Sequence, residues 1–416
     1  MHRTDADATA GHGQGAATGH GAGSGQGAAT GHGAGSGQGA ATGHGAGSGQ
    51  GAATGHGAGP GQGAATGHGA ATGHGAGPGH GAGSGHGAAL ARGAAALGVG
   101  FPLVQAGMGG VAGPALAAAV SSAGALGTVA LYKSAPQEAA ALVQDTARRT
   151  AAPFGVNVIP EVAGGLLLAG QLGAVLDAAD RPLVLNSYGL PPAEFARTVR
   201  EAGHRLLVQA GDPEDAARAF DLGAVAVALQ GTEAGGHHLG TRPLPDLLAR
   251  TAAALPGRVL LAAGGVHDAS DLPPLLDAGA SGCLCGTAFA ATAESAAHPA
   301  YKQALVDTET PDGTVVTDRF SIGWPGRSHR VLRGPVTDAP EPPPARIIAW
   351  TTVAGGRRPV PCGSAAAPTT EAEGRVDDMA RYAGLSTPRI TDIVPAAAVV
   401  ARFRTALPTP THPGRM

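Results

Sequence analysis

The sequence predicts an α/β fold, a TIM (β/α)8 barrel in which eight parallel strands alternate with helices. Short apolar runs rich in Val and Leu recur between about residues 100 and 287, and alanine-rich stretches with helical periodicity separate them. Strands that alternate with helices form right-handed βαβ units and a parallel sheet. Eight repeats over about 200 residues favour a barrel, with an open doubly wound sheet as the alternative.

Each predicted element follows from its own local pattern. The strands are expected at FPLVQA (101–106), LGTVAL (126–131), FGVNVI (154–159), PLVLNS (182–187), RLLVQA (205–210), AVAVALQ (224–230), RVLLAAGG (258–265) and SGCLCGT (281–287). Helices are expected at PALAAAVSSAG (114–124), PAEFARTVREAG (192–203), DPEDAARAFDLG (212–223) and DASDLPPLLDAG (268–279). These helical segments open with Asp or Pro and close on Gly, which is the usual asymmetry of helix ends.

Residues 1–95 are predicted to be a disordered tail. From His20 the unit GHGAGSGQGAAT recurs with a period of 12, which places His20, His32, His44, His56 and His68 in register. Glycine-dense sequence loses much backbone entropy on ordering and has no apolar face to bury in return. The spaced imidazoles could bind divalent metal weakly, but a tether without such a function is the simpler interpretation. Residues 96–335 are assigned to the barrel and residues 336–416 to an extension.

Composition argues against several classes of protein. The formal net charge is −3 and no basic stripe is present, so a nucleic-acid surface is not expected. The sequence has no uninterrupted apolar run of about 18 residues and its start lacks a signal-peptide core, so a soluble, cytoplasmic protein without a membrane span is expected. The chain has three cysteines, Cys283, Cys285 and Cys362. This odd number argues against a disulfide framework, and burial in the core explains the CxC pair better than a metal site does.

Two glycine motifs follow the seventh and eighth predicted strands. They contain Gly264 and Gly265 in the first case, and Gly286 and Thr287 in the second. Barrel enzymes bind ligands at the carboxyl ends of their strands, often with a phosphate on these two loops. Bare backbone N–H groups and a hydroxyl near a helix start suit an anion, so a phosphate-bearing ligand is expected. The alternative is that these glycines only make tight turns.

Amide side chains lie at or near the carboxyl ends of four otherwise apolar strands. They belong to Gln105, Asn157, Gln209 and Gln230. Semi-buried amides need hydrogen-bond partners, and they suit the carbonyls, ring nitrogens and hydroxyls of a flat heteroaromatic cofactor. The alternative is that they bond to one another within the barrel mouth.

Several of these segments resemble the nitronate monooxygenase family, formerly called 2-nitropropane dioxygenases. They are FPLVQAGMGGVAGPALAAAVSSAGALGTV, PFGVNVI, QGTEAGGHHLG, LAAGGV and CGTAFAATAES, spanning roughly residues 99–335. The segment MARYAGLSTPRITDIVPAAAVV near the end is similar to that family's terminal helical segment. The EAGGH sequence is the most specific element. The resemblance implies a barrel that holds non-covalent FMN and oxidises alkyl nitronates, or nitroalkanes as well, with oxygen to a carbonyl compound and nitrite.

The resemblance also implies roles for single residues. Gln105, Ala106, Gly107 and Met108 would line the flavin, with Asn157, Gln209, Gln230, Gly235 and Gly236 near it and Gly264, Gly265, Gly286 and Thr287 at its phosphate. His237 would be the base that removes a proton from the substrate carbon, a role that suits a pKa near neutrality. Adjacent residues of an extended segment point to opposite sides, so His238 is expected to face away. Ser187 or Tyr188 would line the substrate pocket.

One departure from the family pattern concerns the first motif. It reads QAGMGG, where the family more often has proline before the methionine, so the backbone path there is less well defined.

Two other functions stay open at this point. A flavin-dependent enoyl-thioester reductase has a similar barrel and a similar glycine–histidine segment, but it would require NAD(P)H. The sequence shows no dinucleotide fingerprint at a strand-to-helix turn. The second alternative is a metal-binding protein that acts through the histidine-rich tail.

Overall fold

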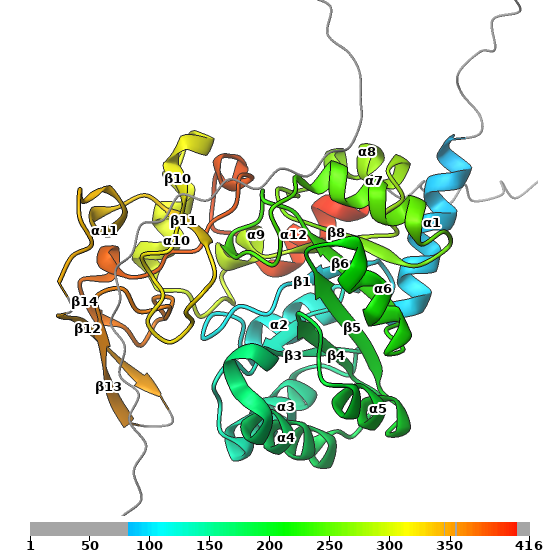
Figure 1. Cartoon of the computed structure of the whole chain (residues 1–416), viewed down its shortest axis with the longest axis horizontal. Helices are drawn as coiled ribbons and strands as arrows, with labels where there is room; N and C mark the ends of the chain where they lie inside the picture. The colour runs from blue at the N-terminus through cyan, green and yellow to red at the C-terminus, as the bar shows by residue number, and fades with distance from the viewer. Residues whose placement is uncertain (1–81, 345, 354–355, 406–416) are drawn as a thin grey trace, which may run out of the picture. The chain divides into compact units, whose positions relative to one another are not determined.

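The computed structural model describes residues 82–344, 346–353 and 356–405, which belong to the compact unit Ala76–Met416 (Figure 1). The histidine repeat up to residue 81, with its predicted disorder and metal binding, lies outside the described residues.

Eight parallel strands form the central sheet, and all eight predicted strands are confirmed. They are β1 (Leu103–Gln105), β2 (Thr128–Ala130), β3 (Gly155–Val158), β4 (Val184–Tyr188), β5 (Arg205–Ala210), β6 (Ala226–Gln230), β8 (Leu260–Ala263) and β9 (Cys283–Cys285). Their order in the sheet is β1-β9-β8-β6-β5-β4-β3-β2, and a parallel bridge between Val104 and Leu126 links the two edges. The sheet is therefore a nearly closed barrel, as predicted.

Helices surround this sheet. They are α2 (Pro114–Ser122), α3 (Pro136–Arg149), α4 (Pro160–Ala178), α5 (Ala193–Glu201), α6 (Pro213–Asp221), α7 (Leu244–Ala254) and α8 (Leu272–Asp277). The four predicted helices are α2, α5, α6 and, after a short 3-10 turn, α8. The sequence signals are visible at α6, where the Asp212 carboxylate accepts from the Asp215 N–H at 2.7 Å and Pro213 occupies the first turn.

Helix α4 is long and apolar enough to cross a membrane by length and composition alone. A break at Gly164, with φ of 66°, interrupts it near its start. Beyond the break Leu168, Leu172 and Val175 pack into the core between helices and sheet, as in a core helix. Leu166 is 91% exposed.

A helix occupies the last residues that the sequence assigned to the tail. Helix α1 (Ala82–Leu97) packs Leu90 into the outer core and Leu97 among strand residues inside the barrel. It lies at the amino ends of the strands, because Gly93 abuts Ser281 and Pro102, which come just before β9 and β1. The glycines of this stretch concealed the helix, which depends on burial of its few leucines.

We expect Leu97→Ala to lower the free energy of unfolding by about 2–5 kcal/mol, because it leaves a cavity among rigid strand side chains. Leu166→Ala is the matched control, since Leu166 is 91% exposed and should change stability by less than about 0.5 kcal/mol. Urea unfolding followed by circular dichroism measures both. Equal effects of the two variants would show that Leu97 does not contribute to the packing inside the barrel.

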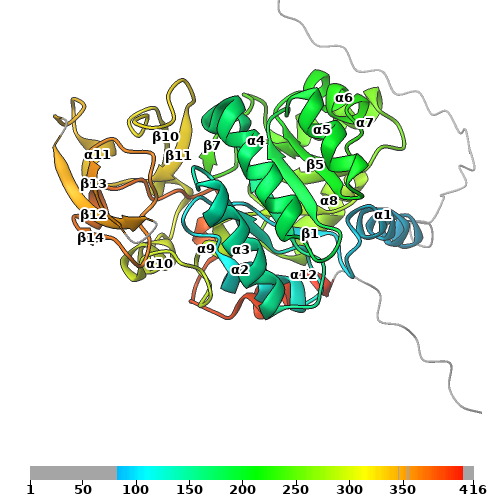
Figure 2. The ribbon, with the colours of Figure 1, turned by 90° about the horizontal axis from the view of Figure 1, so that it is seen from below.

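The chain after β9 builds a second layer of structure beside the barrel (Figure 2). Its helices are α10 (Pro299–Val306) and α11 (Pro335–Asp338), whereas α9 (Thr287–Ala290) and α12 (Ala396–Arg404) pack against the barrel. One small sheet contains β10 (Thr314–Thr317), β11 (His329–Leu332) and β7 (Gly236–His237), and another contains β12 (Ile347–Val353), β13 (Gly356–Pro361) and β14 (Glu373–Gly374). We call residues 314–332 the lid hairpin.

The lid hairpin and the terminal helix join this layer to the barrel. Strand β7, within the glycine–histidine segment, pairs with β11, so the hairpin is attached to the carboxyl end of the barrel. Helix α12 returns to the barrel and buries Val399, Val400 and Phe403 in its outer core. The domain boundary at residues 335/336 stays a prediction. Strands β10 and β11, which precede it, belong to the smaller sheet.

Candidate active site

The loops after the barrel strands bring the predicted flavin residues to one end of the barrel. Gln105 lies in register with Cys285 and Gln230 with Ala263, so the first motif and both glycine loops begin at the same level. The loop residues are half-buried, whereas the strands before them are buried. These residues are Ala106, Gly107, Met108, Gly235, Gly236, Gly264, Gly265, Gly286 and Thr287.

Glycine is required in these loops for two different structural reasons, a close approach of another segment and a backbone with positive φ. A Cβ on Gly235 would lie 2.7 Å from the backbone of Ala383 and Gly384, so this glycine admits the C-terminal segment. Gly236 has φ of 85° and open space where a Cβ would stand. A Cβ on Gly286 would meet Ala106 and Met108 at 3.5 and 3.7 Å, so the loops after β1 and β9 face each other.

The strand-end amides bond largely to the protein itself, which is the alternative that the sequence left open. Asn157 donates to the Asn186 carbonyl at 3.0 Å, and Gln209 donates to the Asn186 side-chain oxygen at 3.1 Å. Gln105 accepts from the Thr128 N–H at 2.9 Å. Among the described residues the buried Asn186 amide nitrogen has no hydrogen-bond partner. Flavin contacts by these amides therefore stay a prediction, and Asn186 joins them as a candidate that sequence reasoning missed.

Gln230 and Tyr188 hold the main chain of His237. The Gln230 amide donates to the His237 carbonyl at 2.9 Å and accepts from the Leu239 N–H at 2.8 Å. The Tyr188 hydroxyl donates to the same carbonyl at 2.7 Å. Ser187 donates to the Gly189 carbonyl at 2.8 Å. Direct contact of Ser187 or Tyr188 with substrate stays a prediction. The Gln230 amide and the Tyr188 hydroxyl both donate to the His237 carbonyl and so fix the position of its main chain.

The imidazole of His237 is enclosed by aromatic rings. It is 5% exposed and stacks on Trp324, with ring centroids 3.8 Å apart and planes inclined by 15°. The rings of His329 and Tyr382 lie 4.8 and 5.4 Å away. Its Nε2 atom is buried without a hydrogen-bond partner among the described residues.

Burial lowers the pKa of His237 to about 3, with smaller contributions from His329 and Arg327. The near-neutral pKa expected from the sequence is wrong, because removing the charged imidazolium from water is costly and no acidic side chain among the described residues compensates for it. His237 is therefore neutral throughout the physiological range.

His238 turns away from the His237 stack, as the alternation of an extended segment predicts. Its Nε2 lies 3.0 Å from the Ala234 carbonyl and its N–H donates to the Ser328 carbonyl at 2.9 Å. The side chain is buried against these loops, and burial lowers its pKa.

Sequence reasoning missed the residues that reach the site from the lid hairpin and from α4. Arg327 binds the Glu161 carboxylate through two nitrogens at 2.7 Å, and the Trp324 Nε1 donates to it at 2.5 Å. Burial acts to raise the pKa of Glu161, but these hydrogen bonds lower it overall. The GWPG turn that carries Trp324 was the one available signal, and nothing local shows which barrel loop it contacts.

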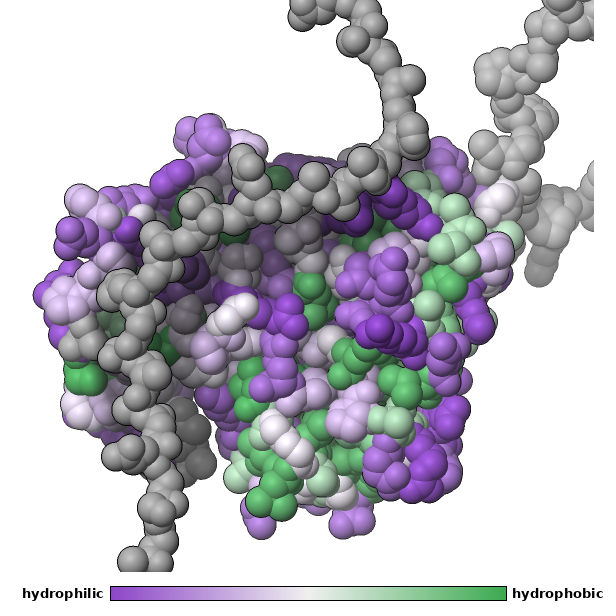
Figure 3. All heavy atoms as spheres, viewed as in Figure 1, coloured by the Kyte–Doolittle hydropathy of each residue, from purple (hydrophilic) through white to green (hydrophobic). Residues whose placement is uncertain are grey.

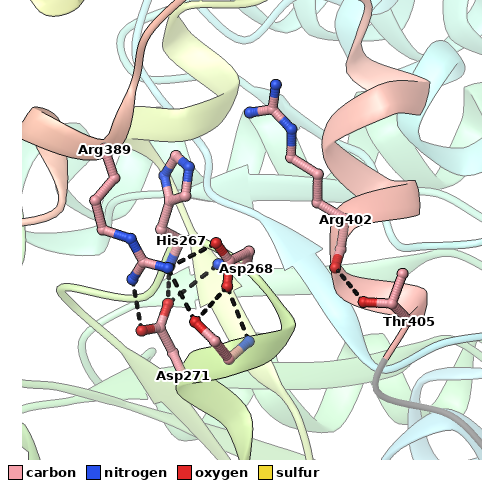
Figure 4. A network of polar contacts seen from close by, with 7 residues as sticks. His267, Asp268, Asp271, Arg389, Arg402 and Thr405 are labelled. Carbon is pink, nitrogen blue, oxygen red and sulfur yellow. Dashed lines mark hydrogen bonds and ion pairs between the residues drawn. The ribbon is translucent and has the colours of Figure 1, made fainter.

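Ion pairs between the C-terminal segment and the loop after β8 hold the loop that carries Gly264 and Gly265 (Figure 4). Arg389, from the C-terminal segment, binds Asp268 and Asp271 at 2.6 Å each. Asp271 also accepts from the His267 N–H at 2.7 Å. The loop containing Gly264 and Gly265 is thereby held to the C-terminal segment, which itself donates a hydrogen bond from the Gly384 N–H to Thr287 at 3.1 Å.

The CxC pair lies buried in the outer core, as the packing interpretation expects. A hydrogen bond with Cys283 and burial raise the pKa of the Cys285 thiol.

The fold and site define an enzyme of the (β/α)8-barrel class, because half-buried glycine loops and an enclosed histidine gather at the carboxyl ends of the strands. The chain belongs to the nitronate monooxygenase family, whose model, described as "Nitronate monooxygenase", matches residues 92–164 and 168–404. The family is flavin-dependent in general, and the protein is an oxidoreductase.

Several individual proteins are similar to this chain, and their names differ. A nitronate monooxygenase of Pseudomonas aeruginosa is 35% identical over 279 residues, which cover 56% of this chain and 78% of that protein. A dehydrogenase of Mycobacterium tuberculosis, named for a hydroxy-methyl-oxo-octahydroindene-carboxyl-CoA substrate, is 35% identical over 57% of this chain and 64% of its own length. The structure of a nitroalkane oxidase from Streptomyces ansochromogenes aligns at 28% identity and a TM-score of 0.58, covering 74% of this chain and 96% of that one.

Proposed function

We propose that the protein is an FMN-dependent enzyme that oxidises alkyl nitronates with oxygen to a carbonyl compound and nitrite. The observation that carries the proposal is a neutral, enclosed His237 beside loops of accessible glycine backbone, in a chain of the nitronate monooxygenase family. Bound flavin would supply electron transfer and the reaction with oxygen, while the protein orients the substrate and excludes water.

The residues present fit a phosphate-bearing cofactor. Gly264, Gly265 and Gly286 leave their main chain half-buried, and a Cβ on Gly286 would project toward Ala106 and Met108. Thr287 accepts one hydrogen bond from Gly384, and its hydroxyl hydrogen stays available to donate. These four residues would hold the phosphate, with Ala106 to Met108 beside the ring.

The properties of His237 favour a nitronate over a neutral nitroalkane. A nitronate has already lost its C–H proton, so it needs no base. A neutral nitroalkane requires His237 to accept that proton, and an imidazole with a pKa of about 3 is a weak base for this step. We therefore propose nitronates as the main substrates, with His237 as the base for those nitroalkanes that react.

The test is to mix the FMN-loaded protein with propionate 3-nitronate in air, without reduced nicotinamide, and to measure nitrite. We expect an FMN absorption spectrum and steady release of nitrite. Protein that takes up no FMN, or that releases no nitrite, would contradict the proposal.

The second candidate is an enoyl-thioester reductase, and its support is limited to the CoA thioester in the name of the Mycobacterium tuberculosis relative, which is itself named a dehydrogenase. The same protein preparation is mixed with an enoyl thioester and NADPH while absorbance at the nicotinamide band is followed. Turnover in this assay alone would replace nitronate oxidation by thioester reduction.

A further inference from the structure

The lid hairpin covers His237 with one large side chain. Trp324 is 8% exposed, and its ring lies flat on the imidazole at 3.8 Å. The Tyr188 ring meets the indole edge-on with ring centroids 5.2 Å apart, and the Tyr132 ring centroid lies 6.2 Å from that of the indole. A substrate atom that approaches His237 must therefore share its surroundings with three aromatic rings.

Polar contacts hold Trp324 in this place from two separate barrel loops. Glu161, at the start of α4, accepts from the indole Nε1 at 2.5 Å and from Arg327 at 2.7 Å. Lys133, in the loop after β2, donates to the Gly323 carbonyl at 2.8 Å. Gly323 and Gly326 have φ of 93° and 83°, which lets the chain turn tightly on both sides of the tryptophan.

The closed arrangement leaves little room at the reactive atom. His237 Nε2 is buried and unpartnered within the described part of the chain, and both the indole and the Tyr188 ring are immobilised by hydrogen bonds. An indole has only two side-chain torsions, so it adapts poorly to a larger ligand once its N–H is fixed. A long acyl chain or a thioester arm would have to displace the indole.

We infer that Trp324 is a specificity-determining residue, which restricts the substrate beside His237 to short nitronates and excludes long or thioester-linked chains. This inference rests on the proposed nitronate oxidation. Glu161 and Arg327 are positioning residues that act through Trp324. In closed apolar sites a single methylene changes kcat/KM by about 10- to 200-fold, so loss of an entire indole should alter chain-length preference measurably.

The experiment compares kcat/KM for ethyl and hexyl nitronate in the wild-type enzyme and in Trp324→Ala. We expect the hexyl-to-ethyl ratio to rise by at least about tenfold in the variant. Trp324→Phe, which keeps a stacked ring, should give an intermediate ratio and guards against a folding defect. The control is Trp350→Ala. Trp350 lies on β12, is 38% exposed and has the Arg357 guanidinium 4.6 Å from its ring centroid. The hexyl-to-ethyl ratio of this variant should equal that of the wild type.

Fluorescence gives a readout that does not depend on turnover. The chain has two tryptophans, so Trp350→Phe leaves Trp324 as the single indole emitter. We expect acrylamide to quench it weakly, and to quench it several-fold more strongly after the further change Glu161→Gln. If acrylamide quenched Trp324 in the Trp350→Phe protein as strongly as it quenches a solvated indole, the closed position of Trp324 would be overturned.

The outcomes separate the two proposals. Nitrite release with the same chain-length ratio in Trp324→Ala and wild type would overturn the specificity inference alone. No nitrite from any nitronate, in the wild type as well, would overturn the proposed function and this inference with it.

Discussion

The His237→Asn enzyme is expected to lose about 10²- to 10⁴-fold in kcat/KM for a neutral nitroalkane, while its kcat/KM for a preformed nitronate falls by less than about tenfold. Only the nitroalkane needs a base. Asparagine retains a polar group of similar size, so the FMN content should stay the same. Nitrite release from nitroethane and from ethyl nitronate measures the two effects.

The matched control is His238→Asn, whose side chain bonds to the Ala234 carbonyl away from the stack. It should change either rate by less than about tenfold. Equal losses in the two variants, or an unimpaired His237→Asn enzyme on nitroethane, would show that the base is elsewhere.

The pH profile tests the same site. Because burial lowers the pKa of His237 to about 3, the imidazole does not become charged between pH 5.5 and 8. The wild-type kcat/KM for nitroethane, whose proton His237 must accept, should therefore show no step from an imidazole in this range. A histidine with its ordinary pKa of about 6.5 would give a step there.

Gly107→Ala is expected to remove bound flavin and to lower the free energy of unfolding by about 1–3 kcal/mol or more. A Cβ at this position would overlap the side chain of Asn157, at its Cβ and Cγ atoms. Asn157 cannot move freely, because it is buried and donates to the Asn186 carbonyl. Urea unfolding and the ratio of flavin to protein absorbance measure both effects.

Gly173→Ala is the control, since a Cβ at Gly173 in α4 meets nothing within 4 Å. Alanine favours a helix over glycine by about 1 kcal/mol, so this variant should be as stable as the wild type or slightly more stable. A Gly107→Ala protein with normal stability and full flavin content would show that the loop after β1 has more space than the structure indicates.

The barrel itself was predictable because its signals are local. The apolar run ending at Gln230 and the Asp-Pro start of α6 each indicate one element without knowledge of the rest of the chain. The eightfold alternation then predicts that the carboxyl ends of the strands meet at one end of the barrel. This prediction placed Gly264 and Gly265, which follow β8, and Gly286, which follows β9, at the same end. The α1 helix was missed because its repeat-like glycines conceal a few leucines whose burial depends on the finished barrel.

The site was only partly predictable. His237 was identified from the EAGGH segment, and its separation from His238 followed from backbone alternation. Its low pKa was not predictable, because it arises first from burial and then from His329. Trp324, which covers the imidazole, and His329 are both carried to the barrel mouth by a hairpin far along the chain. The orphaned amide of Asn186 likewise appears only when three neighbouring strands are in register.

The sequence by itself determined the barrel and the position of the EAGGH segment with His237 at the carboxyl ends of the strands, since periodicity, turn residues and motif spacing act over a few residues at a time. The tertiary structure alone decided what surrounds that histidine. Pairing of β7 with β11 and the contact of Glu161 with Trp324 join segments that share no local pattern. Burial, and with it the protonation and access of His237, depends on those distant contacts.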